Sequence, residues 1–125
     1  MILVDSNVII YSAKPALIGL REHFIGHDAV FSQLSRLEVL GFHGLTAEDK
    51  DYFEAVFAEF PVVPIDAEII DRAIQIRRSH RTRTADAIIA ATALKLDCPL
   101  LTADTRDFLR ISELKVLTTE QIGAN

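Results

Sequence analysis

The chain begins with Met1-Ile2-Leu3-Val4-Asp5-Ser6-Asn7, an apolar run that meets an acid where it ends. The run from Ile2 to Val4 is short and uniformly apolar, so we expect a strand buried on both faces, as in parallel sheets. Asp5 then lies where the strand ends and the chain turns. In open α/β sheets, ligands bind outside the carboxyl ends of the strands, so Asp5 occupies a typical ligand-binding position.

The rest of the chain alternates short apolar runs with segments of helical spacing. Further strands are predicted over 28–31, 61–65, 99–102 and 115–117. Helices are predicted from Pro15 to about Gly26, over 35–42, from 46 to 60, from a cap at Asp66 to a break at 82–84, over 85–96 and briefly over 105–109. Such alternation indicates a parallel sheet flanked by helices. We therefore expect one three-layer α/β domain over residues 1–125, with a short parallel sheet of about five strands.

Composition limits the classes of function. The chain has 125 residues, and half of them are hydrophobic, which suits one packed core and argues against disorder. No apolar run is long enough to span a membrane, and the first residues lack the basic region of a signal peptide. Cys98 is the only cysteine, which excludes an internal disulfide and a zinc site built on several thiolates. We expect a cytoplasmic protein.

The net charge of −5 conceals a local basic cluster. The cluster consists of Arg72, Arg77, Arg78, Arg81 and Arg83. Clustered arginines attract polyanions even on an acidic protein. They also fit a solvated helix end, where basic side chains complement the helix dipole. The closeness of the cluster to Asp86 in the sequence keeps the nucleic-acid interpretation open.

Glu38 has both a structural and a functional interpretation. With Ser35 it fits the S-x-x-E capping box, in which the acid reaches back to the amide of the capping residue. Leu34, Leu37 and Leu40 are expected to form the inward stripe of the same helix, and Glu38 stands at the edge of that stripe. A carboxylate in that position can point into a cleft.

Asp86 opens an apolar helix and is harder to explain by structure alone. It fits a first-turn acid on a helix that Thr82 or Thr84 caps. Its neighbours are too apolar for a surface helix, and a carboxylate at the mouth of a buried helix is costly unless it is paired or binds a metal. Asp5 likewise fits an N-cap, although the polar residue that follows it serves equally well.

A third group of polar side chains follows the strand predicted over 99–102. Asp104 and Asp107 lie three residues apart, so one helical turn places them on one face, and Thr102 adds a hydroxyl nearby. Capping is the alternative for either acid. Because the carboxyl ends of parallel strands meet at one edge, acids from distant segments gather there. Several adjacent carboxylates repel one another and need a hard cation such as Mg²⁺ or Mn²⁺, which indicates phosphate chemistry.

Four segments carry these acids. They are Leu3-Val4-Asp5-Ser6-Asn7-Val8-Ile9, Ser35-Arg36-Leu37-Glu38-Val39-Leu40, Thr84-Ala85-Asp86-Ala87-Ile88-Ile89-Ala90-Ala91-Thr92-Ala93 and Leu101-Thr102-Ala103-Asp104-Thr105-Arg106-Asp107-Phe108. These four segments, in this order, resemble the motifs of the PIN-domain ribonucleases. The resemblance is closest to the VapC-type toxins of bacterial toxin–antitoxin pairs. The resemblance covers almost the whole chain.

This resemblance implies roles for particular residues. Asp5, Glu38, Asp86 and Asp104 would form the catalytic, metal-binding quartet. Asn7, Thr102 and Asp107 would line the same pocket. Many members carry Asn at the position of Asp104, and Asp there implies stronger affinity for a second cation. From the basic cluster itself we expect Arg77, Arg78, Arg81 and Arg83 to hold the flanking phosphates of RNA.

The implied activity is hydrolysis of RNA with Mg²⁺ or Mn²⁺. Water activated by the cation attacks the phosphodiester, which predicts products with a 5′ phosphate. Single-stranded or looped RNA is the expected substrate, because its bases can splay into a cleft. The resemblance also implies a homodimer and a small VapB-like antitoxin that blocks the acidic pocket.

Three alternatives start from other interpretations of the acids. A phospho-accepting receiver domain needs a paired acid beside Asp5 and a lysine after the last strand, where Thr118 and Thr119 follow instead. A phosphotransferase with an aspartate nucleophile needs D-x-D, which Asp5-Ser6-Asn7 breaks. A housekeeping PIN nuclease, or an inactive PIN module that binds RNA, shares the whole pattern.

Overall fold

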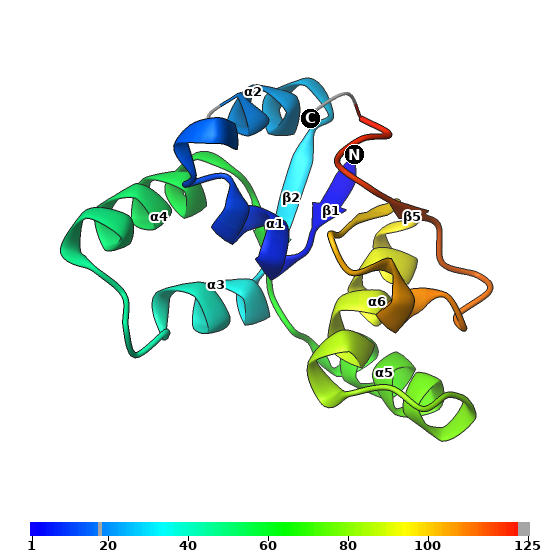
Figure 1. Cartoon of the computed structure of the whole chain (residues 1–125). Coiled ribbons are helices and arrows are strands. Elements are labelled where there is room, and N and C mark those ends of the chain that lie inside the picture. The colour runs from blue at the N-terminus through cyan, green and yellow to red at the C-terminus, as the bar shows by residue number, and fades with distance from the viewer. Residues whose placement is uncertain (18, 123–125) are drawn as a thin grey trace.

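The structure is a computed structural model that describes residues 1–17 and 19–122. Its strands are β1 (Ile2–Val4), β2 (Ala29–Ser32), β3 (Val62–Val63), β4 (Leu100–Leu101) and β5 (Val116–Leu117). Its α-helices are α1 (Ser6–Tyr11), α2 (Leu20–Gly26), α3 (Gln33–Leu40), α4 (Ala47–Glu59), α5 (Ala67–Ser79) and α6 (Thr84–Leu96). Two short 3₁₀ helices are η1 (Pro15–Leu17) and η2 (Thr105–Phe108). Figure 1 shows their arrangement.

The five strands form one sheet in the order β3-β2-β1-β4-β5. Every pairing is parallel, with Leu3 opposite Val30 on one side and opposite Leu100 on the other. The strand that begins the chain is therefore the central one, and its carboxyl end carries Asp5. The predicted α/β class and the parallel sheet of about five strands are confirmed.

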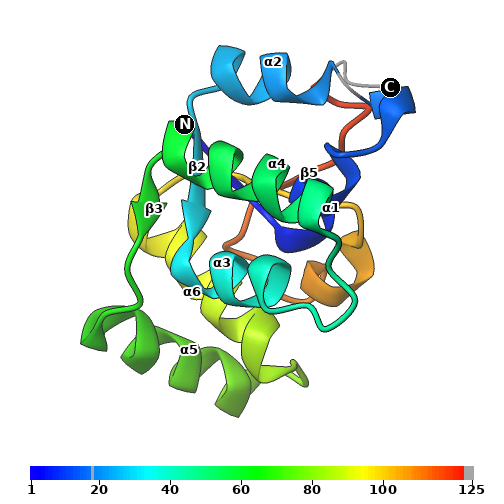
Figure 2. The same ribbon diagram turned by 90° about the vertical axis from the view of Figure 1, so that its left-hand side faces the viewer.

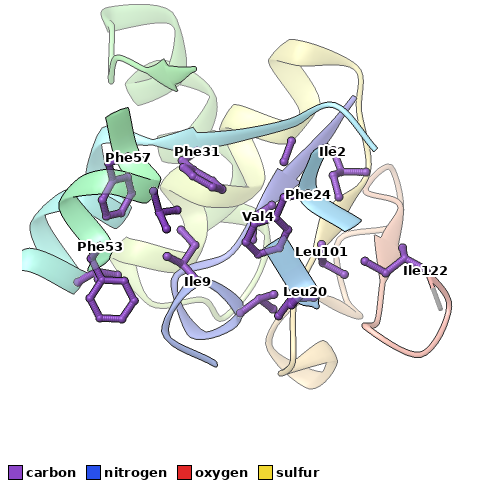
Figure 3. Packing of buried hydrophobic residues seen from close by; sticks show 14 residues of the cluster. Ile2, Val4, Ile9, Leu20, Phe24, Phe31, Phe53, Phe57, Leu101 and Ile122 are labelled. Atoms are coloured by element: carbon purple, nitrogen blue, oxygen red, sulfur yellow. The ribbon is translucent and has the colours of Figure 1, made fainter. Parts of the chain in front are cut away.

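Helices cover both faces of the sheet. Side chains alternate along β1, so Ile2 and Val4 pack into one apolar cluster and Leu3 packs into the other. The first cluster contains residues of α1, α2 and α4 and includes a set of aromatic rings (Figure 3). The second contains residues of α5 and α6 and of the segment after β4. The two helical groups lie on opposite sides of the central strands, which confirms the predicted three layers (Figure 1).

Helix α6 is the buried helix that its sequence predicts. Its residues from Ile89 to Ala93 are all buried, and the small side chains of its buried alanines allow close packing against the sheet and α5. The side view shows α5 running beneath α6 (Figure 2). The helix ends at Asp97, which adopts a left-handed conformation with φ of 51°. No side chain caps its first turn, so neither Thr82 nor Thr84 serves as the expected cap.

Two predicted helices are wrong in extent. The helix expected from Pro15 to about Gly26 is divided into η1 and α2. The helix expected over 35–42 is α3, which begins at Gln33 because the Ser32 hydroxyl accepts the amide hydrogen of Leu34. The capping box of Ser35 and Glu38 is therefore also wrong.

The inward stripe predicted for α3 needs correction too. Leu37 is 69% exposed, whereas Ser35 and Val39 are buried. The Ser35 hydroxyl lies 2.9 Å from the hydroxyl oxygen of Ser6, so this serine can face inward with a polar partner. Among the described residues, no helix is long and apolar enough to cross a membrane.

Candidate active site

The acidic site lies where β1, β2 and β4 end. Helices α1 and α3 follow two of these strands, and α6 begins beside them, so their first turns share one edge of the sheet (Figure 1). Asp5 stands at the end of β1, Glu38 on α3 and Asp86 in the first turn of α6. Thr102 follows β4 directly. Topology thus brings together segments that are far apart in the sequence.

Asp5 is an N-cap, as one of its two interpretations predicts. Its Oδ1 accepts the amide hydrogen of Ser6 at 2.9 Å and caps α1. Its Oδ2 accepts a hydrogen bond from the Thr102 hydroxyl at 2.8 Å. The carboxylate is consequently held from both sides, by the helix that it caps and by the neighbouring strand.

The surroundings of Asp5 disfavour the ionised form of its carboxyl group. Burial raises the pKa of this carboxyl above its ordinary value, while the hydrogen bonds from Thr102 and Ser6 oppose the rise. The negative charges of Asp86 and Glu38 raise the pKa of Asp5 further. Three carboxylates from separate helices and strands therefore interact electrostatically at one edge.

Glu38 is tied to the site through hydroxyl groups. Its Oε1 accepts a hydrogen bond from the Ser6 hydroxyl at 2.7 Å. The Ser6 oxygen also lies 2.9 Å from the hydroxyl oxygen of Ser35, which is fully buried. These contacts hold the glutamate toward α1 instead of toward the start of its own helix. Ser6 and Ser35 were not predicted as site residues, although both flank the acids within the quoted segments.

Asp86 and Asp107 share one arginine. Arg83 Nε lies 3.2 Å from Asp86 Oδ2, and Arg83 Nη2 lies 3.0 Å from Asp107 Oδ2. Burial raises the pKa of Asp86, Arg83 lowers it, and the charges of Asp107 and Glu38 raise it. Asp86 therefore interacts electrostatically with Glu38 on α3 and with Asp107 on η2.

Asp104 and Asn7 contact the site mainly near the backbone. The amide of Asp104 donates to the Thr102 hydroxyl oxygen at 3.1 Å, and Asn7 Oδ1 accepts the amide hydrogen of Ala103 at 3.3 Å. Within the described residues, no hydrogen bond or ion pair links the Asp104 carboxylate to the other acids. Its side chain is exposed at the start of η2.

The donor set suits a hard cation, though not in a closed cage. Across residues 1–17 and 19–122, no three His, Cys, Asp or Glu side chains are close enough to hold one metal ion. Mg²⁺ needs no such cage, since it keeps several waters and usually takes one or two carboxylates plus substrate phosphate. Asp5 and Asp86 offer carboxylate oxygens whose mutual repulsion a cation would relieve. The residues present therefore fit Mg²⁺ or Mn²⁺.

The predicted arginines lead into this edge. Arg77 and Arg78 occupy the last turn of α5, where they also complement the helix dipole. Arg81 and Arg83 lie in the connection to α6, and all four side chains belong to exposed residues. Arg77 Nε donates to the carbonyl oxygen of Thr82 at 3.3 Å, which ties the end of α5 to this connection.

The comparisons with known proteins agree with this arrangement. The PIN domain model matches residues 2–114. The chain is 35% identical over 105 residues to a protein named Ribonuclease VapC from Rickettsia bellii, covering 81% of this chain and 72% of that protein. It shares its fold with a toxin–antitoxin complex from Klebsiella pneumoniae (23% identity, TM-score 0.76, 94% of this chain and 97% of that one). It also shares it with DNA-bound VapBC from Salmonella typhimurium (20% identity, TM-score 0.83, 94% and 96%). The chain therefore belongs to the PIN-domain family, as its four segments predict.

Proposed function

We propose that the protein is a metal-dependent endoribonuclease of the VapC type, which cleaves RNA in the cytoplasm. One observation carries the proposal: Asp5, Glu38 and Asp86 come from distant segments and interact electrostatically at one edge of the sheet. The charges of Asp86 and Glu38 raise the pKa of Asp5, and a partly buried carboxylate whose pKa its neighbours raise is typical of sites that bind cations. The similarity to a protein named Ribonuclease VapC supports RNA as the substrate.

Asp5 and Asp86 would hold Mg²⁺ or Mn²⁺, joined by Asp104. When bound, the cation promotes attack of water on the phosphodiester and balances the charge that develops there. Hydrogen bonds from Thr102 and from the amide of Ser6 fix the orientation of the Asp5 carboxylate. Glu38, oriented by Ser6, would position the attacking water or bind a second ion. Attack by water predicts 5′-phosphate products.

The arginines would bind the substrate on either side of the cleaved bond. Arg77, Arg78, Arg81 and Arg83 are exposed and lead toward Asp86 along the chain. Arginines in such a position contact backbone phosphates and contribute affinity without reading the sequence. Asn7 and Asp107 complete the polar lining. Single-stranded or looped RNA is the expected form of the substrate.

The partner is a small antitoxin, and the active form is a homodimer. The similar structure from Klebsiella pneumoniae is a toxin–antitoxin complex. On this chain an apolar hollow between α1, α3 and α4 offers a surface of the right character, with Ile10 and Phe42 exposed at its rim. A short upstream gene for a DNA-binding protein would support the toxin assignment over a housekeeping nuclease.

The test is cleavage of 5′-labelled structured RNA with Mg²⁺, Mn²⁺ or EDTA. We expect metal-dependent cuts in the wild type, and a loss of about a hundredfold or more in both Asp5→Asn and Asp86→Asn. Circular dichroism checks that both variants are folded. Cutting that survives EDTA or both substitutions would contradict the proposal. Binding of the RNA without cutting would instead indicate an inactive PIN module.

A further inference from the structure

Arg83 differs from the other arginines of the cluster because it is bound to the acids. Its guanidinium contacts Asp86 Oδ2 at 3.2 Å and Asp107 Oδ2 at 3.0 Å, and so joins the first turn of α6 to η2. Within the described part of the chain, it is the cation that forms ion pairs with the acids of this edge. The guanidinium thus supplies positive charge where the carboxylates would otherwise repel one another.

The exposure of the arginine makes this bridge accessible to a competing ligand. The Arg83 side chain is 77% exposed, whereas those of Asp86 and Asp107 are 16% and 31% exposed. The acids are thus held by the fold, while the arginine reaches them from solvent. Exposed ion pairs contribute little stability, so a stronger ligand for the same oxygens can displace the guanidinium.

The oxygen that Arg83 contacts on Asp86 belongs to the carboxylate that we assign to the metal. A divalent cation on the Asp86 carboxylate would lie close to the guanidinium that contacts its Oδ2, and the two positive charges would repel each other. Binding of the metal and pairing with Arg83 therefore oppose each other.

We propose that Arg83 is an internal counter-ion of the acidic site, which competes with the divalent cation for Asp86 and Asp107. This inference rests on the proposed function, because it takes Asp86 as a metal ligand. Without metal, the guanidinium neutralises the edge. When the cation binds, Arg83 is released into solvent, close to the path of the substrate. The affinity of the site for metal is therefore set partly by a residue that does not bind it.

Isothermal titration of Mn²⁺ into the RNA-free protein tests the competition. Arg83→Gln should tighten Mn²⁺ binding by about two- to tenfold, since each exposed ion pair that metal must break is weak. Arg83→Lys keeps the charge but cannot bridge both acids. Its affinity for Mn²⁺ should therefore fall between those of the wild type and Arg83→Gln. Arg106→Gln is the matched control, because it removes the same charge from the residue beside Asp107 and has no pair with these acids. Its affinity should stay within about twofold of the wild type.

A second readout follows the arginine itself. In nitrogen-15 spectra, the Nε–H signal that disappears in Arg83→Gln should move when Mg²⁺ is added to the wild type. Equal or weaker Mn²⁺ binding in Arg83→Gln, or an equal gain in Arg106→Gln, would overturn the inference while the metal site stands. An absence of Mn²⁺ binding in every variant would overturn the metal site as well. Unfolding curves confirm that each variant is folded.

Discussion

At the residue scale, ionisation of Asp5 lowers the stability of the folded protein. Its carboxyl has a raised pKa, so the folded protein holds this proton more tightly than the unfolded chain, whose value is near 3.8. The stability that follows is fully present below that value and is lost as pH rises through the raised pKa. At neutral pH the folded protein therefore bears an ionised group that its surroundings disfavour.

Asp5→Asn should consequently inactivate the protein and stabilise it. Asn keeps the N-cap, because it is as good a capping residue as Asp. In EDTA we expect the melting temperature of Asp5→Asn to exceed that of the wild type by roughly 1–4 °C at pH 7.5, with the gap narrowing toward pH 4.5. Differential scanning calorimetry at both pH values measures this difference in melting temperature. A variant that melts below the wild type at pH 7.5 would contradict the raised pKa.

Ser6 is a site residue that the sequence did not single out. Its hydroxyl donates to Glu38 at 2.7 Å, so Ser6→Ala leaves this glutamate free to adopt other rotamers. We expect cleavage to slow by about tenfold, because the loss affects the positioning of an acid that stays in place. Steady-state cleavage with Mg²⁺ measures this effect. Ser12→Ala is the control, since Ser12 is also buried but donates to the carbonyl of Ile9 away from the acids.

At the scale of elements, α3 shows why its buried face was predicted wrongly. The leucines at 34, 37 and 40 repeat at helical spacing, and this pattern favoured a face that the structure places partly in solvent. The buried face instead contains Ser35 and Val39, because Ser35 pairs with Ser6 inside the protein. A periodicity rule scores serine as polar and cannot recognise a polar partner that comes from another helix.

Substitutions on the two faces of α3 separate these interpretations. Val39→Ala removes a side chain that is 1% exposed and should cost about 1–3 kcal/mol of unfolding free energy. Leu37→Ala acts on a side chain that is 69% exposed and should change that free energy by less than about 0.5 kcal/mol. Urea unfolding at constant pH measures both. Equal losses of unfolding free energy in the two variants would indicate that Leu37 is buried, as the leucine spacing predicts.

At the scale of the whole molecule, strand order places the site. The sequence shows where each strand ends, so it predicts that Asp5 and Thr102 belong to one edge, and parallel pairing of β1 with β4 joins them. The order of the strands and the rotamers of the acids depend on long-range packing, which no local pattern contains. The bridge from Arg83 to two acids is of this kind, because it links positions 24 residues apart through one exposed side chain.

Charge distribution over the whole molecule leads to the last prediction. The net charge is −5, yet four arginines lie in the last turn of α5 and in its connection to α6. Binding of RNA should therefore weaken steeply with salt, because each phosphate contact releases counterions. Arg77→Gln should lower the slope of log affinity against log salt by about 0.7, the value for one contact on a single strand.

The control is Lys50→Gln, which removes the same charge from α4, where Lys50 pairs with Glu54 at 3.5 Å. Its salt slope should equal that of the wild type. Fluorescence anisotropy of a labelled single-stranded RNA in EDTA, measured from low to moderate salt, gives both slopes without cleavage. If the two variants lost slope equally, RNA would be responding to total charge and not to the arginines beside Asp86. A loss confined to Arg77→Gln places the path of RNA along the end of α5, leading to the carboxylates.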